Sequence, residues 1–300
     1  DLGGEITNYC GRMFAQLGAD VILVEPIDGS SYRGSMPTAG EGGESLRFAY
    51  DNADKKSIGV DLSTPGGRDV FSRLADTADL LLDDRTQHDL RSGGFPHEQL
   101  STLFPNLTTT AITPFGLTGP YADFAATDAT CMAFGGMLWL GGYDAGPPVQ
   151  PAGRQAFRAG SLFGAVASMA SLTANERSSG ELIDVSVQEC VSLGLENAIQ
   201  FYDLEGHVRR RHGGKQKQAG FGVYPCADGY VVLIAAGIGG NRFWPNFVAW
   251  MKEEQVPGAD VLDDPRWSER DGGEGPQAQS RCWDVVATDS TTGRGEDLRA

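Results

Sequence analysis

Positive charge is scarce in this sequence. Its 300 residues include 24 Lys and Arg against 40 Asp and Glu, which gives a net charge of −16 at pH 7. A protein that binds nucleic acid needs an excess of cations facing the phosphates, so we expect no nucleic-acid partner. A local basic site for a small phosphorylated ligand remains compatible with this balance.

Long apolar runs and clustered metal ligands are also missing. No run of about 18 apolar residues occurs, so we expect no membrane-spanning helix. The four His are dispersed, and no metal site is expected. The five Cys show no paired spacing, which is typical of reduced thiols and indicates a cytoplasmic protein. They are Cys10, Cys131, Cys190, Cys226 and Cys282.

Acidic residues are abundant, yet none lies between Asp144 and Glu176. Within this gap the sequence predicts a loop from Pro151 and then a helix over 156–174. Ala, Gly and Ser recur along that helix, so other backbone segments can pack closely against it. A strand over 182–187 and a helix over 188–202 are expected to follow.

The first residues predict a strand, a turn, a helix and a second strand. Asp1-Leu2-Gly3 is typical of the end of a strand, so we expect that an earlier part of this strand is missing. A helix over 7–17 and a buried strand over 19–26 complete a βαβ unit. The intervening turn, residues 3–7, lacks the G-x-G-x-x-G spacing, so NAD is not the expected ligand.

Further helices and strands are expected along the chain. Expected elements are a helix after Pro65, strands over 79–83 and 107–113, and a helix over 96–104. A hairpin over 221–233 contains an Asp-Gly turn, and a helix over 244–252 follows it. Residues from Ser268 onward are rich in Gly, Asp and Ser, and we expect them to be mobile.

Several motifs together resemble the family III CoA-transferases. They are LGADVILVEP (17–26), NADKKSIGVDL (52–62), FGLTGPY (115–121), RSSGELIDVSVQE (177–189) and YPCADGYV (224–231). This is the CaiB/BaiF family, which includes formyl-CoA transferase, carnitine CoA-transferase and 2-methylacyl-CoA racemase. The motifs occur in family order, and the resemblance covers residues 1–267.

The resemblance implies an α/β fold with a large Rossmann-like parallel-sheet domain and a smaller domain. We assign residues 1–203 to the large CoA-binding domain, 204–222 to a linker, and 223–300 to the start of a small α+β domain. The family's C-terminal return segment is then missing. Relatives form interlocked dimers, so we expect this chain to interlock with itself or with a homologous CoA-transferase subunit.

The resemblance also implies coenzyme A or an acyl-CoA as substrate, with no metal. In relatives, turns beside the strand ends hold the 3′-phosphoadenosine end of CoA, where cations and backbone N–H groups can bind phosphate. The corresponding residues are Arg33, Lys55, Lys56, Val60, Asp84, Arg85 and Arg91. Asp84 replaces an Asn that meets the adenine, and a carboxylate can accept a hydrogen bond but cannot donate as an amide does.

The catalytic acid of the family is absent from its expected position. In relatives, an Asp shortly before the Gly that opens the long helix attacks the acyl-CoA and carries CoA as an enzyme-linked thioester. That Gly corresponds to Gly160, so the acid's position falls at Gln155 or Ala156. The racemases also use a His before the residue equivalent to Asp128. Here it is Thr127, which disfavours proton exchange.

Three functions remain open from the sequence. The favoured one is a non-catalytic, CoA-binding subunit of a heteromeric transferase, which moves CoA to a small carboxylic acid using a partner's Asp. The second is a self-sufficient CoA-transferase or acyl-CoA isomerase that uses another carboxylate. Candidates for that carboxylate are Asp128, Asp144 and Glu189. The third is a non-enzymatic CoA-binding scaffold.

Overall fold

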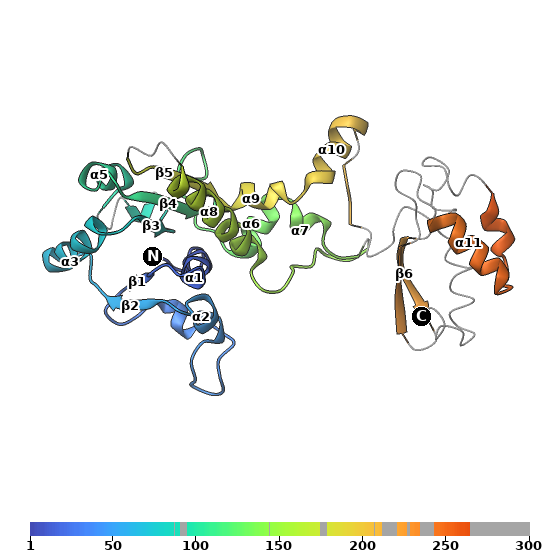
Figure 1. Ribbon diagram of the computed structural model, residues 1–300, viewed down its shortest axis with the longest axis horizontal. Helices are drawn as coiled ribbons and strands as arrows, with labels where there is room; N and C mark the ends of the chain where they lie inside the picture. The colour runs from blue at the N-terminus through green and yellow to red at the C-terminus, as the bar shows by residue number, and fades with distance from the viewer. Residues whose placement is uncertain are drawn as a thin grey trace. The chain divides into compact units, whose positions relative to one another are not determined.

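The computed structural model describes residues 1–86, 88–90, 95–143, 145–174, 179–206, 208–211, 221–226, 229–234 and 243–264 (Figure 1). The chain divides into two compact units. Unit 1 comprises residues 1–141 and 148–210, and unit 2 comprises residues 142–147 and 211–300. The domain limits at 203 and 223 that we infer from the sequence stay a prediction.

Parallel strands form the centre of unit 1. Strand β1 (Ile22–Glu25) pairs with β2 (Lys56–Gly59), and β4 (Thr108–Thr113) lies between β3 (Leu80–Asp83) and β5 (Leu182–Ser186). This arrangement confirms the predicted α/β class.

The extended segment Asp1–Leu2 connects the two groups of strands. The Val24 N–H donates to Asp1 O (2.9 Å), and the Leu2 N–H donates to Leu82 O (2.8 Å). The segment therefore occupies a strand position between β1 and β3. The resulting order, β2–β1–(1–2)–β3–β4–β5, is that of a doubly wound dinucleotide-binding sheet, and the strand order reverses beside residues 1–2.

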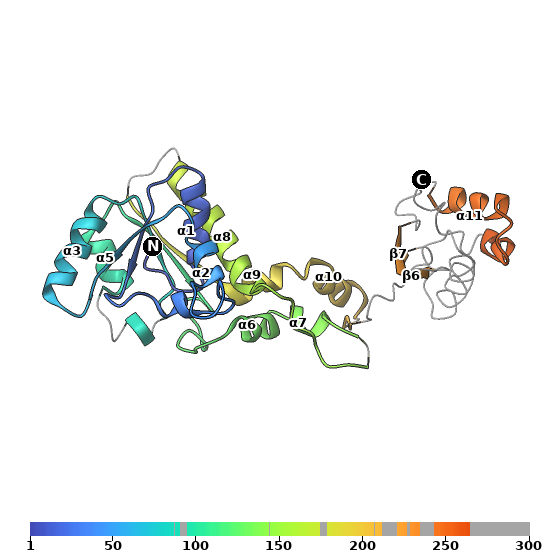
Figure 2. The ribbon, with the colours of Figure 1, turned by 90° about the horizontal axis from the view of Figure 1, so that it is seen from below.

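Helices cover both faces of this sheet (Figure 2). Leu82 and Ile112 belong to a core shared with α1 (Asn8–Gln16) and α8 (Gln155–Thr173). Leu81 belongs to a second core, shared with α3 (Pro65–Asp76) and α5 (His97–Leu103). Adjacent strand residues point to opposite faces, so Leu81 and Leu82 serve the two cores in turn. Other helices with described bounds in unit 1 are η1 (Ser31–Gly34), α2 (Leu46–Asp51), α6 (Asp128–Phe134), α7 (Met137–Leu140), α9 (Val187–Leu193) and α10 (Glu196–Glu205).

Small residues bring α8 close to the sheet, as the sequence predicts. A Cβ atom on Gly160 would lie 2.7 Å from Val187 Cγ2, and one on Gly164 would overlap the side chain of Ile112. Ser168 is fully buried and its Oγ lies 2.7 Å from Thr110 Oγ1 on β4. A larger residue at either glycine would force the helix away from the strand.

One predicted helix is wrong in its extent. The sequence predicts a single helix over 188–202, but the structure has α9 and α10 with a break at Gly194 and Leu195. The Gly194 N–H donates to Val191 O instead of continuing the α-helical pattern. A Cβ atom at Gly194 would approach Met137 Cε at 3.1 Å, so glycine permits the chain to turn against α7.

Unit 2 is smaller. Strands β6 (Phe221–Cys226) and β7 (Gly229–Ile234) form an antiparallel pair, followed by α11 (Phe243–Glu253) and η2 (Ala259–Asp263). The hairpin and the helix confirm the prediction. Their core contains Tyr224, Trp244, Val248, Met251 and Leu262. The segment from Ser268 onward, which the sequence predicts to be mobile, lies outside the described residues.

Candidate functional site

The carboxyl ends of the unit 1 strands form one edge of the sheet. In open α/β sheets, ligands bind outside this edge at the point where the strand order reverses. Arg33 and Val60 follow β1 and β2, while Asp84 and Arg85 follow β3 directly. The structure therefore brings these four of the seven predicted CoA-binding residues to the same edge.

Arg33 is fixed by the end of β1. Its Nε and Nη2 donate to the two carboxylate oxygens of Glu25 (2.8 and 2.6 Å), and its guanidinium lies 4.2 Å from the ring centre of Phe48. Hydrogen bonding by Arg33 lowers the pKa of Glu25 to about 2. The Glu25 side chain is 4% exposed and that of Arg33 is 46% exposed. Arg33 thus presents a fixed cation to solvent at the sheet edge.

Asp84 lies at the point where the strand order reverses. Its Oδ2 accepts hydrogen bonds from the Gly4 N–H (2.8 Å) and the Ile6 N–H (3.4 Å), which fastens the turn after residues 1–2. Burial and the neighbouring charge of Asp83 raise the pKa of Asp84 to about 6. A carboxylate here is therefore held in an unfavourable environment, at the position where relatives are expected to have Asn.

Arg85 supports the adjacent carboxylate. Its Nη2 lies 2.7 Å from Oδ2 of the fully buried Asp83, and His97 Nε2 lies 3.1 Å from the same oxygen. Although burial opposes ionisation, the hydrogen bonds from His97 and Arg85 lower the pKa of Asp83 to about 2. Arg85 retains 17% exposure of its side chain, so part of it still faces the edge.

Of the two predicted lysines, Lys55 directly precedes β2 and Lys56 is its first residue, so both start at the opposite edge of the sheet. The Lys55 ammonium is buried and donates to Asp1 Oδ2 (2.7 Å), Asn8 O (2.7 Å) and Asn52 Oδ1 (2.8 Å). Lys56 pairs with Asp20 at 2.8 Å, and both side chains are exposed. The structure does not bring either lysine to the carboxyl edge, and Arg91 lies outside the described residues.

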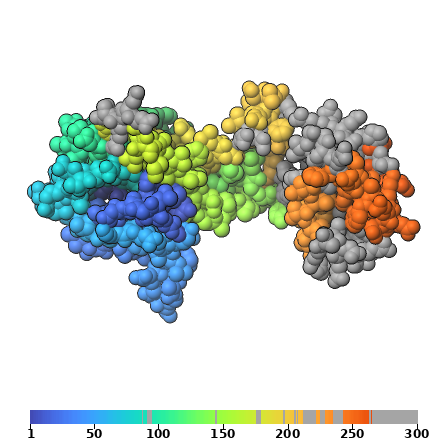
Figure 3. Space-filling view, in the orientation of Figure 1, coloured from blue at the N-terminus to red at the C-terminus, as the bar shows by residue number. Residues whose placement is uncertain are grey.

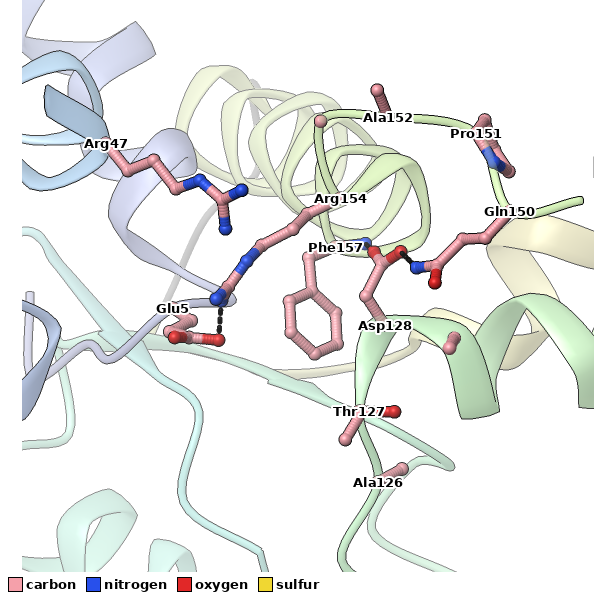
Figure 4. Close-up of a pocket in the computed structure, with 12 residues that line it drawn as sticks. Glu5, Arg47, Ala126, Thr127, Asp128, Gln150, Pro151, Ala152, Arg154 and Phe157 are labelled. Atoms are coloured by element: carbon pink, nitrogen blue, oxygen red, sulfur yellow. Dashed lines mark hydrogen bonds and ion pairs between the residues drawn. The ribbon is translucent and has the colours of Figure 1, made fainter. Parts of the chain in front are cut away.

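A cavity of about 570 Å³ lies at the start of α8, where the family's acid is expected (Figure 4). Gln155 is exposed and its Nε2 donates to Ala152 O (2.9 Å), while Ala156 is fully buried. Neither residue offers a carboxylate. The cavity is lined by Glu5, Arg47, Ala126, Thr127, Asp128, Ala129, Gln150, Pro151, Ala152, Gly153, Arg154 and Phe157.

Asp128 lies beside this cavity but has a structural task. Its Oδ1 accepts the Phe157 N–H (3.0 Å), and its Oδ2 accepts Gln150 Nε2 (3.0 Å). Phe157 is in the first turn of α8, so Asp128 caps an N–H that has no partner within the helix. Asp128 is 6% exposed. Both of its oxygens are therefore engaged, which disfavours it as a nucleophile.

Of the other two candidate nucleophiles, only Glu189 lies within the described residues, and it is not among those that line this cavity. Glu189 is exposed in the first turn of α9, where its N–H donates to Ser186 Oγ (3.3 Å). Asp144 lies outside the described residues.

Two arginines, Arg47 and Arg154, line the cavity, and a third, Arg158, lies one turn further along α8. Arg154 begins α8 in the left-handed region (φ 55°) and forms an ion pair with Glu5. Arg158, one turn later, pairs with Asp51 (2.6 Å) and lies 4.1 Å from the ring centre of Tyr9. Arg47 reaches in from α2. The sequence interpretation missed these cations, although two Arg one turn apart at an acid-free helix start could have indicated an anion site.

Among the described residues, no three His, Cys, Asp or Glu side chains are grouped so that they could hold a metal ion. No helix in the described part of the chain is long and apolar enough to cross a membrane.

Comparison with known proteins decides the family. The model for CoA-transferase family III matches residues 6–281. This chain belongs to CoA-transferase family III. The family assignment by resemblance is therefore confirmed, and CoA thioesters are the substrates that such transferases use.

The chain spans about two thirds or less of the length of the curated relatives that it matches. It is 41% identical over 273 residues to the succinyl-CoA:(R)-benzylsuccinate CoA-transferase subunit BbsE of Thauera aromatica, covering 89% of this chain and 66% of that protein. It is 31% identical over 230 residues to the succinyl-CoA–D-citramalate CoA-transferase of Chloroflexus aurantiacus, covering 76% of this chain and 57% of that protein.

Solved structures agree with the fold. A CaiB/BaiF family protein from Brucella suis matches with a TM-score of 0.79 and 26% identity, over 97% of this chain and 76% of that one. A hypothetical protein from Mycobacterium tuberculosis, Rv3272, matches with a TM-score of 0.77 and 24% identity, over 97% and 75% of the two chains. The second likeness bears on the fold alone.

Proposed function

We propose that this chain is the CoA-binding, non-catalytic subunit of a heteromeric CoA-transferase that moves CoA between carboxylic acids. The observation that carries the proposal is the acid-free start of α8. Ala156 is fully buried, Gln155 is an amide, and both oxygens of the nearby Asp128 are engaged. Without a free carboxylate there, the covalent transfer of the family cannot proceed at this position.

The catalytic Asp then comes from a homologous partner subunit. The names of relatives support this arrangement, because one is a subunit of a benzylsuccinate CoA-transferase and others are the alpha and beta subunits of a succinyl-CoA–L-malate CoA-transferase. The same names support a dicarboxylic acid as acceptor and succinyl-CoA as donor. An interlocked pair of homologous chains in the cytoplasm is the proposed assembly.

In this proposal CoA binds at the carboxyl edge of the unit 1 sheet. Arg33 contacts the 3′-phosphate, because it is a fixed and half-exposed guanidinium after β1. Val60 and Arg85 border the nucleotide, and Asp84 accepts from the adenine amino group. Lys55 holds the start of β2 against residues 1–2 through its buried ammonium. Roles for Lys56 and Arg91 in CoA binding stay predictions.

Replacement of Arg33 tests this placement. We expect Arg33→Gln to weaken CoA binding at least about tenfold, because a charge-assisted contact to phosphate is lost. Binding of dephospho-CoA, which lacks the 3′-phosphate, should change little. Isothermal titration of both ligands measures the difference. Arg73→Gln is the matched control, since Arg73 lies exposed on α3 and pairs with Asp69. Equal losses for CoA and dephospho-CoA would contradict the assigned contact.

A further inference from the structure

Arg47 is the uncompensated cation of the cavity at the start of α8. No carboxylate of the described residues lies within ion-pair distance of Arg47, whereas Arg154 and Arg158 are paired with Glu5 and Asp51. Figure 4 shows the Arg47 side chain extending from α2 toward the guanidinium of Arg154. The segment that leads into α2, coloured light blue in Figure 3, projects from unit 1.

The acids of the cavity do not offset this charge. Glu5 is paired with Arg154, and Asp128 accepts one hydrogen bond at each oxygen. Burial and the charge of Arg158 lower the pKa of Arg154, which shows that cations are crowded here. The N-terminus of the 19-residue helix α8 adds partial positive charge from its first N–H groups. An anion in the cavity would relieve this crowding.

We propose that the cavity at the start of α8 binds the free carboxylate of a small dicarboxylic acid, either as the acid itself or as its CoA thioester, and that Arg47 makes the direct contact. A dicarboxylic acid that is esterified to CoA at one end keeps one charged carboxylate, and a guanidinium holds a carboxylate through two parallel hydrogen bonds. Phe157 and Ala126 provide apolar surface for the carbon chain between the two ends.

The size and the composition of the cavity fit this ligand class. A volume of about 570 Å³ exceeds what a four- or five-carbon acid needs and leaves space for the arm of a thioester. The choice of a dicarboxylic acid rests on the proposed function, whereas carboxylate binding by Arg47 rests on the geometry. Arg47 is thus proposed as a residue that selects acids with a second carboxylate.

Titration of the complete protein with succinate and butyrate tests the proposal, because the two acids have the same chain length but differ by one carboxylate. We expect succinate to bind more tightly than butyrate. Arg47→Gln in this chain should weaken succinate binding at least about tenfold and leave butyrate unchanged. Arg47→Lys, which keeps the charge but not the planar fork, should cause a smaller loss. Arg73→Gln should behave as the unmodified protein.

Unchanged succinate affinity in Arg47→Gln, or equal affinities of the unmodified protein for succinate and butyrate, would overturn the proposal. Parallel titrations with succinyl-CoA and butyryl-CoA separate the two sources of the carboxylate. If the protein fails to bind CoA but binds succinate in an Arg47-dependent way, the carboxylate site is kept and the proposed function is removed. Normal CoA binding together with unchanged succinate binding in Arg47→Gln would keep the proposed function and remove the carboxylate site. Circular dichroism melting verifies that each variant is folded.

Discussion

At the scale of single residues, the carboxylates near the two candidate sites differ in how far their surroundings stabilise the charged form. Asp128 receives an N–H from α8 and an amide from Gln150, so its charge is used to hold a helix start. Glu25 is stabilised as an anion by Arg33. Asp84 has no cation partner in the described structure and receives two backbone N–H groups. Ionisation of Asp84 therefore lowers the stability of the folded protein.

Asp84→Asn should therefore change the pH dependence of stability. Burial and the charge of Asp83 raise the pKa of Asp84 from its ordinary value of 3.8 to about 6 in the folded protein. Between these values the folded state binds more protons than the unfolded state, so the stabilisation present at low pH is lost as pH rises through about 6. Asn does not ionise, and its oxygen can still accept from Gly4 and Ile6.

We expect Asp84→Asn to be more stable than the unmodified protein by about 3 kcal/mol above pH 6, with the gain disappearing toward pH 4. Urea unfolding between these pH values measures the difference in free energy of unfolding between Asp84→Asn and the unmodified protein. Titrating groups that behave alike in the two proteins do not contribute to this difference. Asp69→Asn, on the exposed face of α3, controls for loss of a surface carboxylate. A difference that is constant across this range would contradict the assigned origin.

At the scale of elements, α8 connects the sheet to the cavity. Its glycines set the distance to β4, Arg154 precedes its first turn, and Gln155 and Ala156 begin that turn. Because the same helix carries the glycines that face β4 and the residues at the cavity, a displacement of α8 from the sheet should also displace the cavity wall. The packing of this helix is therefore part of the site.

Gly164→Ala should destabilise unit 1 by about 1–3 kcal/mol, because the added methyl group would overlap Ile112. Gly66→Ala is the matched control. It also replaces a helical glycine, in α3, but nothing lies within 4 Å of the new Cβ, so we expect no loss. Thermal unfolding of both variants provides the comparison. Equal stability of the two variants would mean that α8 can move away from β4 at no cost.

The sequence predicts the long elements of unit 1 well, because their signals are local. These signals are the small-residue pattern of α8, the cap and proline at the start of α3, the apolar run of β3 and the β-branched residues of β4. Each lies within a few turns or one strand. The short helices α2 and α7 carry too few residues for a periodic signal. The break after α9 lies at Gly194, which packs near Met137, a residue distant in sequence.

At the scale of the whole molecule, the sequence predicts the family and the sheet edge but not every residue at it. Motif order indicates which turns follow parallel strands, and Arg33, Val60, Asp84 and Arg85 lie there. Lys55 precedes β2 and Lys56 begins it, so the direction of a parallel strand places them at the other edge. The buried network of Lys55 and the approach of Arg47 to α8 join segments far apart in sequence, which no local pattern reveals.

The central claim concerns which subunit carries the covalent intermediate. Intact-protein mass spectrometry of the chain with its homologous partner, after incubation with succinyl-CoA, tests it directly. We predict a covalent CoA-sized adduct on the partner and none on this chain, because the start of α8 offers Gln155 and Ala156 in place of a carboxylate. An adduct on this chain, mapped to one of its own acids, would contradict the account and identify a self-sufficient transferase.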